Sequence, residues 1–459
     1  MPVTVQPKKA KNARPIHCVA RDRLAESGAG DAALAWAKAN RFSGEAGKVL
    51  PIPGPDGGVA GAFLGVDAAA GPGMGALGTG ALAKALPEGD WYFAGPLERP
   101  ALAALGAALG GYAFTRYGKK NGADIRLACP SGADAADVTR LAEGVFLARD
   151  LINTPTNEMG PEAMEAAARE LARRHEATVS VIEGDALLQK NFPMIHAVGR
   201  ASAEAPRLID MRWGPKNAPK VTLVGKGVAF DTGGLDIKPA SNMLLMKKDM
   251  GGAANVLGLA HMIMAGGFKV ALRVLVPAVE NAISGNAFRP GDVLKSRKGI
   301  TVEIGNTDAE GRLILADALA YADEEAPELL IDMATLTGAA RVALGPDLPP
   351  FFTGDETLAA DLAAAAVSEA DPLWRLPLWD GYDQKYSSKI ADINNVNTDG
   401  FAGALIAALF LRRFTGKAKS WAHFDIFGWS PVDRPHCPIG GEAQGIRAIE
   451  KVLRDRYGN

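Results

Sequence analysis

Three charged side chains recur at every second position in the stretch 306–313, Asn-Thr-Asp-Ala-Glu-Gly-Arg-Leu. If the backbone stays extended, Asp308, Glu310 and Arg312 project from one face. Two carboxylates this close repel each other, and one guanidinium neutralises only one of them. A divalent cation is the simplest missing charge, because carboxylate oxygens suit Mg²⁺, Mn²⁺ and some Zn²⁺ sites. A solvated acidic turn with a salt bridge is the alternative, so a metal site needs further ligands elsewhere in the chain.

A second group of charged residues lies in the segment 225–239, directly after the apolar run 221–224. Glycines frame this segment, which contains one acid and two lysines: Asp231, Lys226 and Lys238. A fully apolar run of this kind is typical of a buried parallel strand. Because ligands of parallel sheets bind beyond the carboxyl ends of the strands, we expect this segment to lie at a ligand-binding edge.

A fourth carboxylate, Asp249, precedes a helical pattern over residues 251–265, and a helix N-terminus carries positive charge. Taken singly, these residues have simpler explanations, since Asp249 suits a helix N-cap and Lys238 suits a surface turn. Taken together, three charged loops at strand ends supply four carboxylates. That number is enough for two divalent ions that share bridging ligands, the arrangement used in metal-assisted hydrolysis.

The composition is that of an ordinary globular protein. Of 459 residues, 48% are hydrophobic and 22% are charged, and the length predicts two or three domains. The formal net charge of −2 offers no long-range attraction for nucleic acid. Three scattered cysteines favour a reducing compartment over a disulfide framework. The longest apolar run, residues 402–411, is shorter than the ~20 residues that span a bilayer. We therefore expect a cytoplasmic protein that does not bind a membrane.

Strands and helices alternate along the chain, which predicts an α/β fold. Residues 1–132 are predicted to form a small N-terminal α/β domain, residues 133–155 a connecting helix, and residues 156–459 a larger catalytic domain. The larger domain is expected to have a mostly parallel central sheet flanked by helices. Its sheet is expected to contain strands at 221–224, 270–276, 300–304 and 329–333, and strand-like runs precede it at 178–182, 194–198 and 208–213.

Three motifs together resemble the signature of the leucine aminopeptidase (cytosol aminopeptidase) family. They are G-K-G-x-x-F-D-[ST]-G-G-x-x-[IL]-K-P at 225–239, M-K-x-D-M-G-G-A-A at 246–254 and N-T-D-A-E-G-R-L at 306–313. The resemblance runs in order from about residue 153 to the C-terminus. It implies an aminopeptidase that releases N-terminal residues from peptides, two divalent metal ions per subunit (Mn²⁺ or Zn²⁺), and a homohexamer.

The resemblance also implies a set of metal ligands. Asp231 and Glu310 match the carboxylates that bridge the two metals. Lys226 and Asp249 match the ligands that complete one site, and Asp308 matches a ligand of the other. A lysine that binds a metal must be a neutral amine, so the pKa of Lys226 is expected to be strongly lowered beside the cation.

Two further matches concern catalysis. Lys238 matches the residue that stabilises the tetrahedral oxyanion. Arg312 matches the residue that holds a bicarbonate, which takes the proton from the attacking water, and a guanidinium fork suits such an oxyanion. The expected substrate contacts are Met246, Thr335 and Leu336.

The C-terminal part of the chain matches the family less closely. Residues 421–425, Trp-Ala-His-Phe-Asp, resemble a structural W-x-H-x-D motif. Residues 437–445 depart from the commoner family ending, so the resemblance does not define the outer wall of the specificity pocket or imply a preference for leucine.

Two other functions remain open. A DNA-binding regulatory protein on the same fold is one alternative, because some relatives bind DNA, although the near-neutral charge disfavours it. A dinuclear phosphoesterase is the other. The sequence has neither H-E-x-x-H nor G-x-S-x-G, which excludes a thermolysin-like zinc site and a hydrolase of the G-x-S-x-G type. We expect an enzyme of intracellular peptide turnover that acts on peptides with a free N-terminus.

Overall fold

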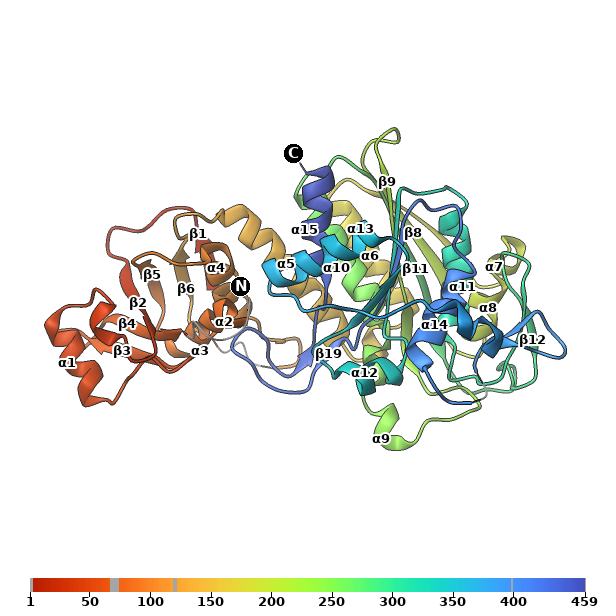
Figure 1. Ribbon diagram of the computed structural model, residues 1–459, viewed down its shortest axis with the longest axis horizontal. Helices are drawn as coiled ribbons and strands as arrows, with labels where there is room; N and C mark the ends of the chain where they lie inside the picture. The colour runs from red at the N-terminus through yellow and green to blue at the C-terminus, as the bar shows by residue number, and fades with distance from the viewer. Residues whose placement is uncertain (1–2, 67–73, 119–121, 398, 459) are drawn as a thin grey trace. The chain divides into compact units, whose positions relative to one another are not determined.

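The computed structural model of the chain describes residues 3–66, 74–118, 122–397 and 399–458 and divides into two compact units (Figure 1). The first unit contains Met1–Phe146, Ala366–Asp371 and Ser430–Ile439, and the second contains Leu147–Ala365, Pro372–Trp429 and Gly440–Asn459. The boundary between Phe146 and Leu147 lies inside helix α5 (Ala135–Asn153). The domain boundaries expected at residues 132 and 155 remain predictions.

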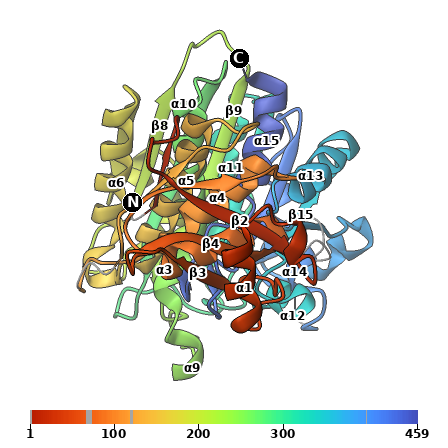
Figure 2. The same ribbon diagram turned by 90° about the vertical axis from the view of Figure 1, so that its left-hand side faces the viewer.

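The first unit is built on a mostly parallel sheet in the order β1-β6-β5-β2-β4-β3, with β3 antiparallel to β4. Its strands are β1 (Val3–Gln6), β2 (Arg14–Ala20), β3 (Val49–Pro53), β4 (Val59–Val66), β5 (Gly89–Ala94) and β6 (Ile125–Ala128). Figure 2 faces this unit and shows β4 between β2 and β3. The predicted α/β arrangement of the N-terminal region is confirmed.

Alternating side chains of β4 build two separate cores in this unit, because neighbouring residues of a strand point to opposite faces. Leu64 packs in one cluster with Trp91 and with helix α4 (Pro100–Gly110), and Phe63 packs in the other with Ala37 of helix α1 (Asp31–Ala39). Both faces of the sheet are therefore covered by helices.

The second unit contains the larger sheet, in the order β16-β15-β18-β14-β9-β11-β8-β7, with β10 also paired to β11. Its strands are β7 (Thr178–Glu183), β8 (Arg207–Trp213), β9 (Lys220–Gly225), β10 (Gly227–Asp231), β11 (Ala271–Asn281), β14 (Leu329–Ala334), β15 (Pro350–Thr353), β16 (Trp374–Arg375) and β18 (Trp421–Asp425). The central strands β18, β14, β9 and β11 are parallel. In contrast, β8 and β7 pair antiparallel with their neighbours, and β15 pairs antiparallel with β18 and parallel with β16. The predicted mostly parallel sheet is confirmed.

Helices cover both faces of this sheet (Figure 1). One layer contains α6 (Pro161–Arg174), α10 (Gly251–Ala265) and α15 (Ile446–Tyr457), and the other contains α8 (Pro193–Gly199), α11 (Gly311–Asp323) and α14 (Gly403–Arg412). The second layer contributes many residues to a large apolar core, which includes Leu313, Leu319 and Phe410. No helix in the described ranges is both long and apolar enough to cross a membrane.

Three local predictions were wrong. Residues 194–198 form helix α8 instead of a strand, because Pro193 occupies its first turn and a buried carboxylate accepts its first N–H groups. The strand predicted at 300–304 is β13 (Thr301–Glu303), which belongs to a separate three-stranded sheet with β12 (Val293–Lys295) and β17 (Ile393–Asn394). The stretch 306–313 is not extended throughout, since helix α11 begins at Gly311 and places Arg312 in its first turn.

The carboxylate that caps α8 belongs to Asp317, a fully buried residue of α11. Its Oδ2 accepts the backbone N–H groups of Met194 at 2.8 Å and Ile195 at 3.4 Å, and its Oδ1 accepts that of Arg297 at 2.7 Å. Asp317 thereby joins α11, the helix that begins at the charged stretch, to two other segments.

Asp317→Ala should destabilise the second unit, because it leaves buried N–H groups without an acceptor at roughly 1–3 kcal/mol each. Thermal or urea unfolding should show a clear loss of stability. Asp317→Asn should lose less stability than Asp317→Ala, since its amide oxygen still accepts a hydrogen bond. Asp185→Ala should lose the least stability, because the Asp185 side chain is 91% exposed. Equal stability of Asp317→Ala and Asp185→Ala would contradict this role.

Candidate metal centre and substrate pocket

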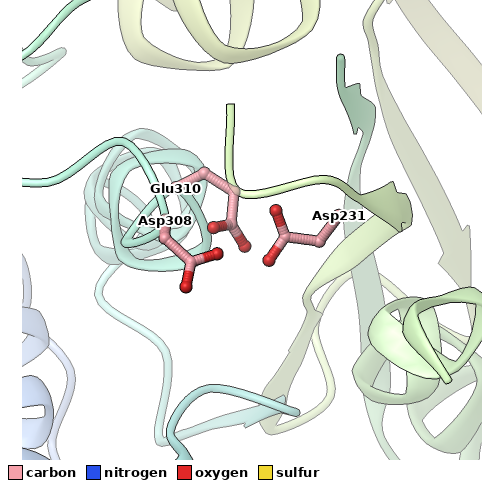
Figure 3. Close-up of side chains that lie close together, drawn as sticks. All are labelled: Asp231, Asp308 and Glu310. Atoms are coloured by element: carbon pink, nitrogen blue, oxygen red, sulfur yellow. The ribbon is translucent and has the colours of Figure 1, made fainter. Parts of the chain in front are cut away.

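The charged residues predicted from three separate motifs meet at the carboxyl edge of the second unit's sheet. Lys226 follows β9, Asp231 ends β10, and Asp308 and Glu310 precede α11. The carboxylates of Asp231, Asp308 and Glu310 point toward one another, each offering an oxygen within 4.8 Å of the others (Figure 3). Asp249 joins them from the short 3₁₀ helix Met246–Met250.

Two lysines neutralise part of this acidic cluster. The Lys226 ammonium lies 2.7 Å from Asp249 Oδ2 and 2.9 Å from Glu310 Oε1, and it donates to the Thr335 carbonyl at 3.1 Å. The Lys238 ammonium lies 2.9 Å from Asp231 Oδ2 and also pairs with Asp308. The predicted metal ligands and Lys238 therefore share one site.

Negative charge remains in surplus, because four carboxylates face two ammonium groups. Burial, followed by repulsion from Asp231, raises the pKa of Glu310 well above its ordinary range and raises that of Asp308 to about 6. Burial lowers the pKa of Lys226, but attraction to Asp249 and then Glu310 outweighs it, so the net shift is upward. The lowered pKa expected for Lys226 concerns this side chain beside a bound cation, so that expectation stays a prediction.

The residues present fit a divalent cation. Glu310 is 1% exposed, and its Oε2 has no hydrogen-bond partner among the described residues. A buried carboxylate oxygen without a donor is costly in a protein interior. Carboxylate oxygens converging on one point are the ligands that hard divalent cations prefer. The cluster therefore has both the surplus charge and the free ligand atom that a cation requires.

Glycines allow the loops to approach each other this closely. A Cβ added to Gly311 would lie 2.5 Å from Lys226 Cε, and one added to Gly252 would lie 2.1 Å from the Met333 carbonyl oxygen. The backbone of Lys226 is itself held on both sides, since its N–H donates to Met333 and its carbonyl accepts from Ala253. Any side chain at Gly311 would push the lysine away from the acids.

Two asparagines that sequence reasoning missed position the site. Asn281, at the end of β11, donates to Asp231 Oδ1 at 2.8 Å. Asn395 accepts from the Gly305 N–H and donates to the Asn306 carbonyl, both at 2.8 Å, so it holds the loop that carries Asp308. Neither belongs to a recognisable motif, and only the location of Asn281 at the end of a long apolar run could have indicated it.

Arg312 is buried but is not among the residues that line the pocket. It is 8% exposed, and its Nη1 donates to the Asn395 carbonyl at 2.6 Å. Its Nε has no hydrogen-bond partner within the described residues. Burial lowers the pKa of Arg312, although the neighbouring Tyr386 and Glu310 act in the opposite direction. The guanidinium therefore keeps donor capacity close to Glu310.

A cavity of about 270 Å³ opens onto the acidic cluster. Its wall contains the three expected substrate contacts, Met246, Thr335 and Leu336. It also contains residues that the sequence did not single out for binding: Lys248, Arg341, Ile426 and Phe427. Burial lowers the pKa of Lys248 to about 8.

The W-x-H-x-D motif forms a supporting network beneath this cavity. Asp425 accepts from the Leu336 N–H at 2.9 Å and from the Thr337 hydroxyl at 2.6 Å, which fixes the loop after β14. Asp332 accepts from Trp421 Nε1 at 2.8 Å and lies 2.5 Å from His423 Nδ1. These buried contacts join β14 to β18 and match the structural role that the resemblance implies.

A more open hollow of about 840 Å³ lies elsewhere in the second unit, beside β15 and β16. Its charged groups are already paired. Arg375 Nη2 lies 2.6 Å from Glu356 Oε1, and Asp355 accepts the N–H groups of Thr357 and Leu358 at the start of helix α13 (Glu356–Ser368). The smaller cavity, which opens onto the acidic cluster, is therefore the better candidate for the active site.

In a comparison with known protein families, the chain matches two family domains. "Cytosol aminopeptidase family, catalytic domain" matches residues 146–449, and "M17 aminopeptidase, N-terminal domain" matches residues 14–130. Proteins named probable cytosol aminopeptidase from Geobacter sp. (strain M21) and Cereibacter sphaeroides are 43% and 40% identical to the chain. These matches cover 76% and 82% of this chain and 74% and 79% of the relatives.

Two solved structures resemble the whole chain. The cytosol aminopeptidase from Coxiella burnetii has a TM-score of 0.93 and 45% identity, with 99% of each chain covered. The bottromycin maturation enzyme BotP in complex with Mn has a TM-score of 0.87 and 32% identity, with 97% of this chain and 100% of that chain covered.

Gly311→Ala should weaken metal binding, because the new methyl group displaces the Lys226 side chain from Asp249 and Glu310. We expect metal affinity to fall by about tenfold or more, as for other changes that disturb ligand positions, and calorimetric titration with Mn²⁺ would measure it. Gly285→Ala is the matched control, since nothing lies within 4 Å of its added Cβ. Equal affinity of the two variants would show that Gly311 is not needed for the site.

Proposed function

The chain belongs to the cytosol aminopeptidase family and is an aminopeptidase, and we propose that it cleaves the first peptide bond by metal-assisted attack of water. The surplus of carboxylates supports this chemistry most directly, because Glu310 Oε2 at the edge of the pocket has no donor among the described residues. The comparisons lend no support to a DNA-binding regulator or a dinuclear phosphoesterase.

We assign Lys226, Asp231, Asp249, Asp308 and Glu310 as ligands of two divalent cations, Mn²⁺ or Zn²⁺. The related enzyme BotP was solved in complex with Mn, and the oxygen-rich donor set here suits Mn²⁺. Bound at this site, two such cations lower the pKa of a water molecule and polarise the scissile carbonyl.

The remaining charged residues act on the substrate and the proton. Lys238 presents an ammonium in the pocket wall, where it stabilises the negative charge that develops on the carbonyl oxygen. Arg312 would hold a bicarbonate through its Nε, which has no hydrogen-bond partner among the described residues, and a bicarbonate bound there would supply a base for the attacking water. Met246, Thr335 and Leu336 position the substrate. Asp425 keeps the loop of Leu336 in place.

Membership of the family supports a proposal for the biological setting. We propose that the substrates are peptides with a free N-terminus, that the enzyme works in the cytoplasm in peptide turnover, and that it assembles as a homohexamer. The relatives' name, cytosol aminopeptidase, supports the location. The formal net charge of −2 gives no reason to expect a nucleic-acid partner.

Hydrolysis should depend on metal and on a free amine. Leucine amide and a leucyl dipeptide should be cleaved, chelation should abolish cleavage, and adding Mn²⁺ or Zn²⁺ should restore it. The matched N-acetylated substrate should be resistant, because it lacks the free amine that defines an exopeptidase substrate. Full activity after metal removal, verified by elemental analysis, or equal cleavage of the acetylated substrate would refute the proposal.

Because we assign Asp308 to metal binding and Arg312 to proton transfer, variants of the two residues should have different effects. Asp308→Asn should weaken metal binding by about tenfold or more, because an amide is a poorer ligand than a carboxylate. Arg312→Ala should retain both metals and lower kcat by roughly a hundredfold, in the range for loss of a proton-transfer group. Metal content per subunit and steady-state kinetics distinguish them, and loss of metal from Arg312→Ala would contradict the assignment.

A further inference from the structure

Lys248 is a buried cation in the pocket wall that the proposed chemistry does not use. It is 6% exposed and lies in the 3₁₀ helix Met246–Met250, next to Asp249. Within the described residues its ammonium has no hydrogen-bond or ion-pair partner, and it lies over the Phe427 ring, 4.7 Å from the centroid. A nearly buried lysine without an acceptor is costly. Lys248 therefore offers the pocket a charged donor that has no acceptor among the described residues.

The acids near Lys248 are bound by other groups. Asp249 Oδ2 is bound by Lys226 at 2.7 Å, and Asp249 Oδ1 accepts from the Thr335 hydroxyl at 2.8 Å. The Asp425 oxygens accept from the loop that follows β14. Lys226 and Lys238 each contact two carboxylates, whereas Lys248 contacts none among the described residues. Lys248 attracts both neighbouring acids at longer range but makes no bond to either.

A second cation shares the same end of the pocket. Arg341, in helix α12 (Gly338–Leu344), lines the cavity, and its Cζ lies 5.2 Å from the centroid of the Phe427 ring. Two cations thus contact one aromatic ring, and a ring face attracts cations but cannot satisfy all their N–H donors. The pocket has an acidic end at the metal ligands and a basic end at Lys248 and Arg341.

We propose that Lys248 is a specificity-determining residue that binds a carboxylate of the substrate. A charge-assisted N–H···O bond would supply the acceptor that the ammonium lacks. The carboxylate can come from the side chain of an N-terminal glutamate or aspartate, or from the C-terminus of a short peptide. The inference rests on the proposed aminopeptidase function and names the substrate class that this site selects.

The test compares substrates that differ only in that charge. Comparing glutamyl amide with glutaminyl amide tests a carboxylate on the N-terminal side chain. Comparing Leu-Gly with Leu-Gly amide tests a carboxylate at the C-terminus of a short peptide. For at least one pair, the wild-type enzyme should favour the carboxylate by about ten- to a hundredfold in kcat/KM, the range for a hydrogen bond to a charged group. K248M should reduce that ratio to near one, and K248R should restore much of it by returning the charge.

Lys247 provides the matched control. It precedes Lys248, donates to the Asn153 carbonyl at 2.7 Å and is absent from the pocket wall, so K247M should keep the wild-type ratios. Ratios near one for both pairs in the wild-type enzyme, or ratios unchanged by K248M, would overturn the inference.

A binding measurement separates this inference from the proposed function. Calorimetric titration of the Mn²⁺-loaded protein with glutamate and glutamine, and with uncleavable analogues of Leu-Gly and Leu-Gly amide in which CH₂–NH replaces the peptide bond, reads the preference without turnover. Inactivity toward every substrate would refute the proposed function alone. Equal binding within both pairs would refute the role of Lys248.

Discussion

The structure around the active site depends on one electrostatic constraint, the convergence of four carboxylates, three of them almost fully buried, on only two ammonium groups. Asp231, Asp249 and Glu310 are almost fully buried, and like charges at this range can coexist only if protons or cations neutralise them. Lys226 and Lys238 each bridge two acids and provide part of that neutralisation. The remaining surplus makes the cluster suited to metal ions.

The parallel sheet brings these groups together. β9 lies between β14 and β11, and the parallel strands end at the same edge, so the residues that follow them become neighbours although they are far apart in the sequence. Glycines at 252 and 311 remove side chains where loops must touch. Asn281 and Asn395 then fix the loops by hydrogen bonds. The sheet and the small polar side chains together therefore position the charged residues of the site.

The pocket has two ends of opposite charge, and they have different physical origins. At the acidic end, lysines and carboxylates neutralise one another directly. At the basic end, Lys248 and Arg341 contact the ring of Phe427 instead of acids. Phe427 also belongs to the C-terminal part of the chain, near the segment that departs from the commoner family pattern. The basic end therefore combines the variable position of the second motif, Lys248, with Arg341 and Phe427, which lie outside the three motifs.

The sequence by itself determined the chemical groups and their order along the chain, because charge, glycine content and apolar runs are local properties. The three motifs, the α/β class and the strands at 221–224 and 329–333 were all predicted from such patterns. Only the tertiary structure decided that 194–198 is a helix, that β13 leaves the central sheet and that α11 begins at Gly311. It also decided which lysine pairs with which acid and that Asn281, Asn395 and Lys248 reach the site. These outcomes rest on partners distant in sequence, such as Asn395 and Gly305, and local patterns do not encode such contacts.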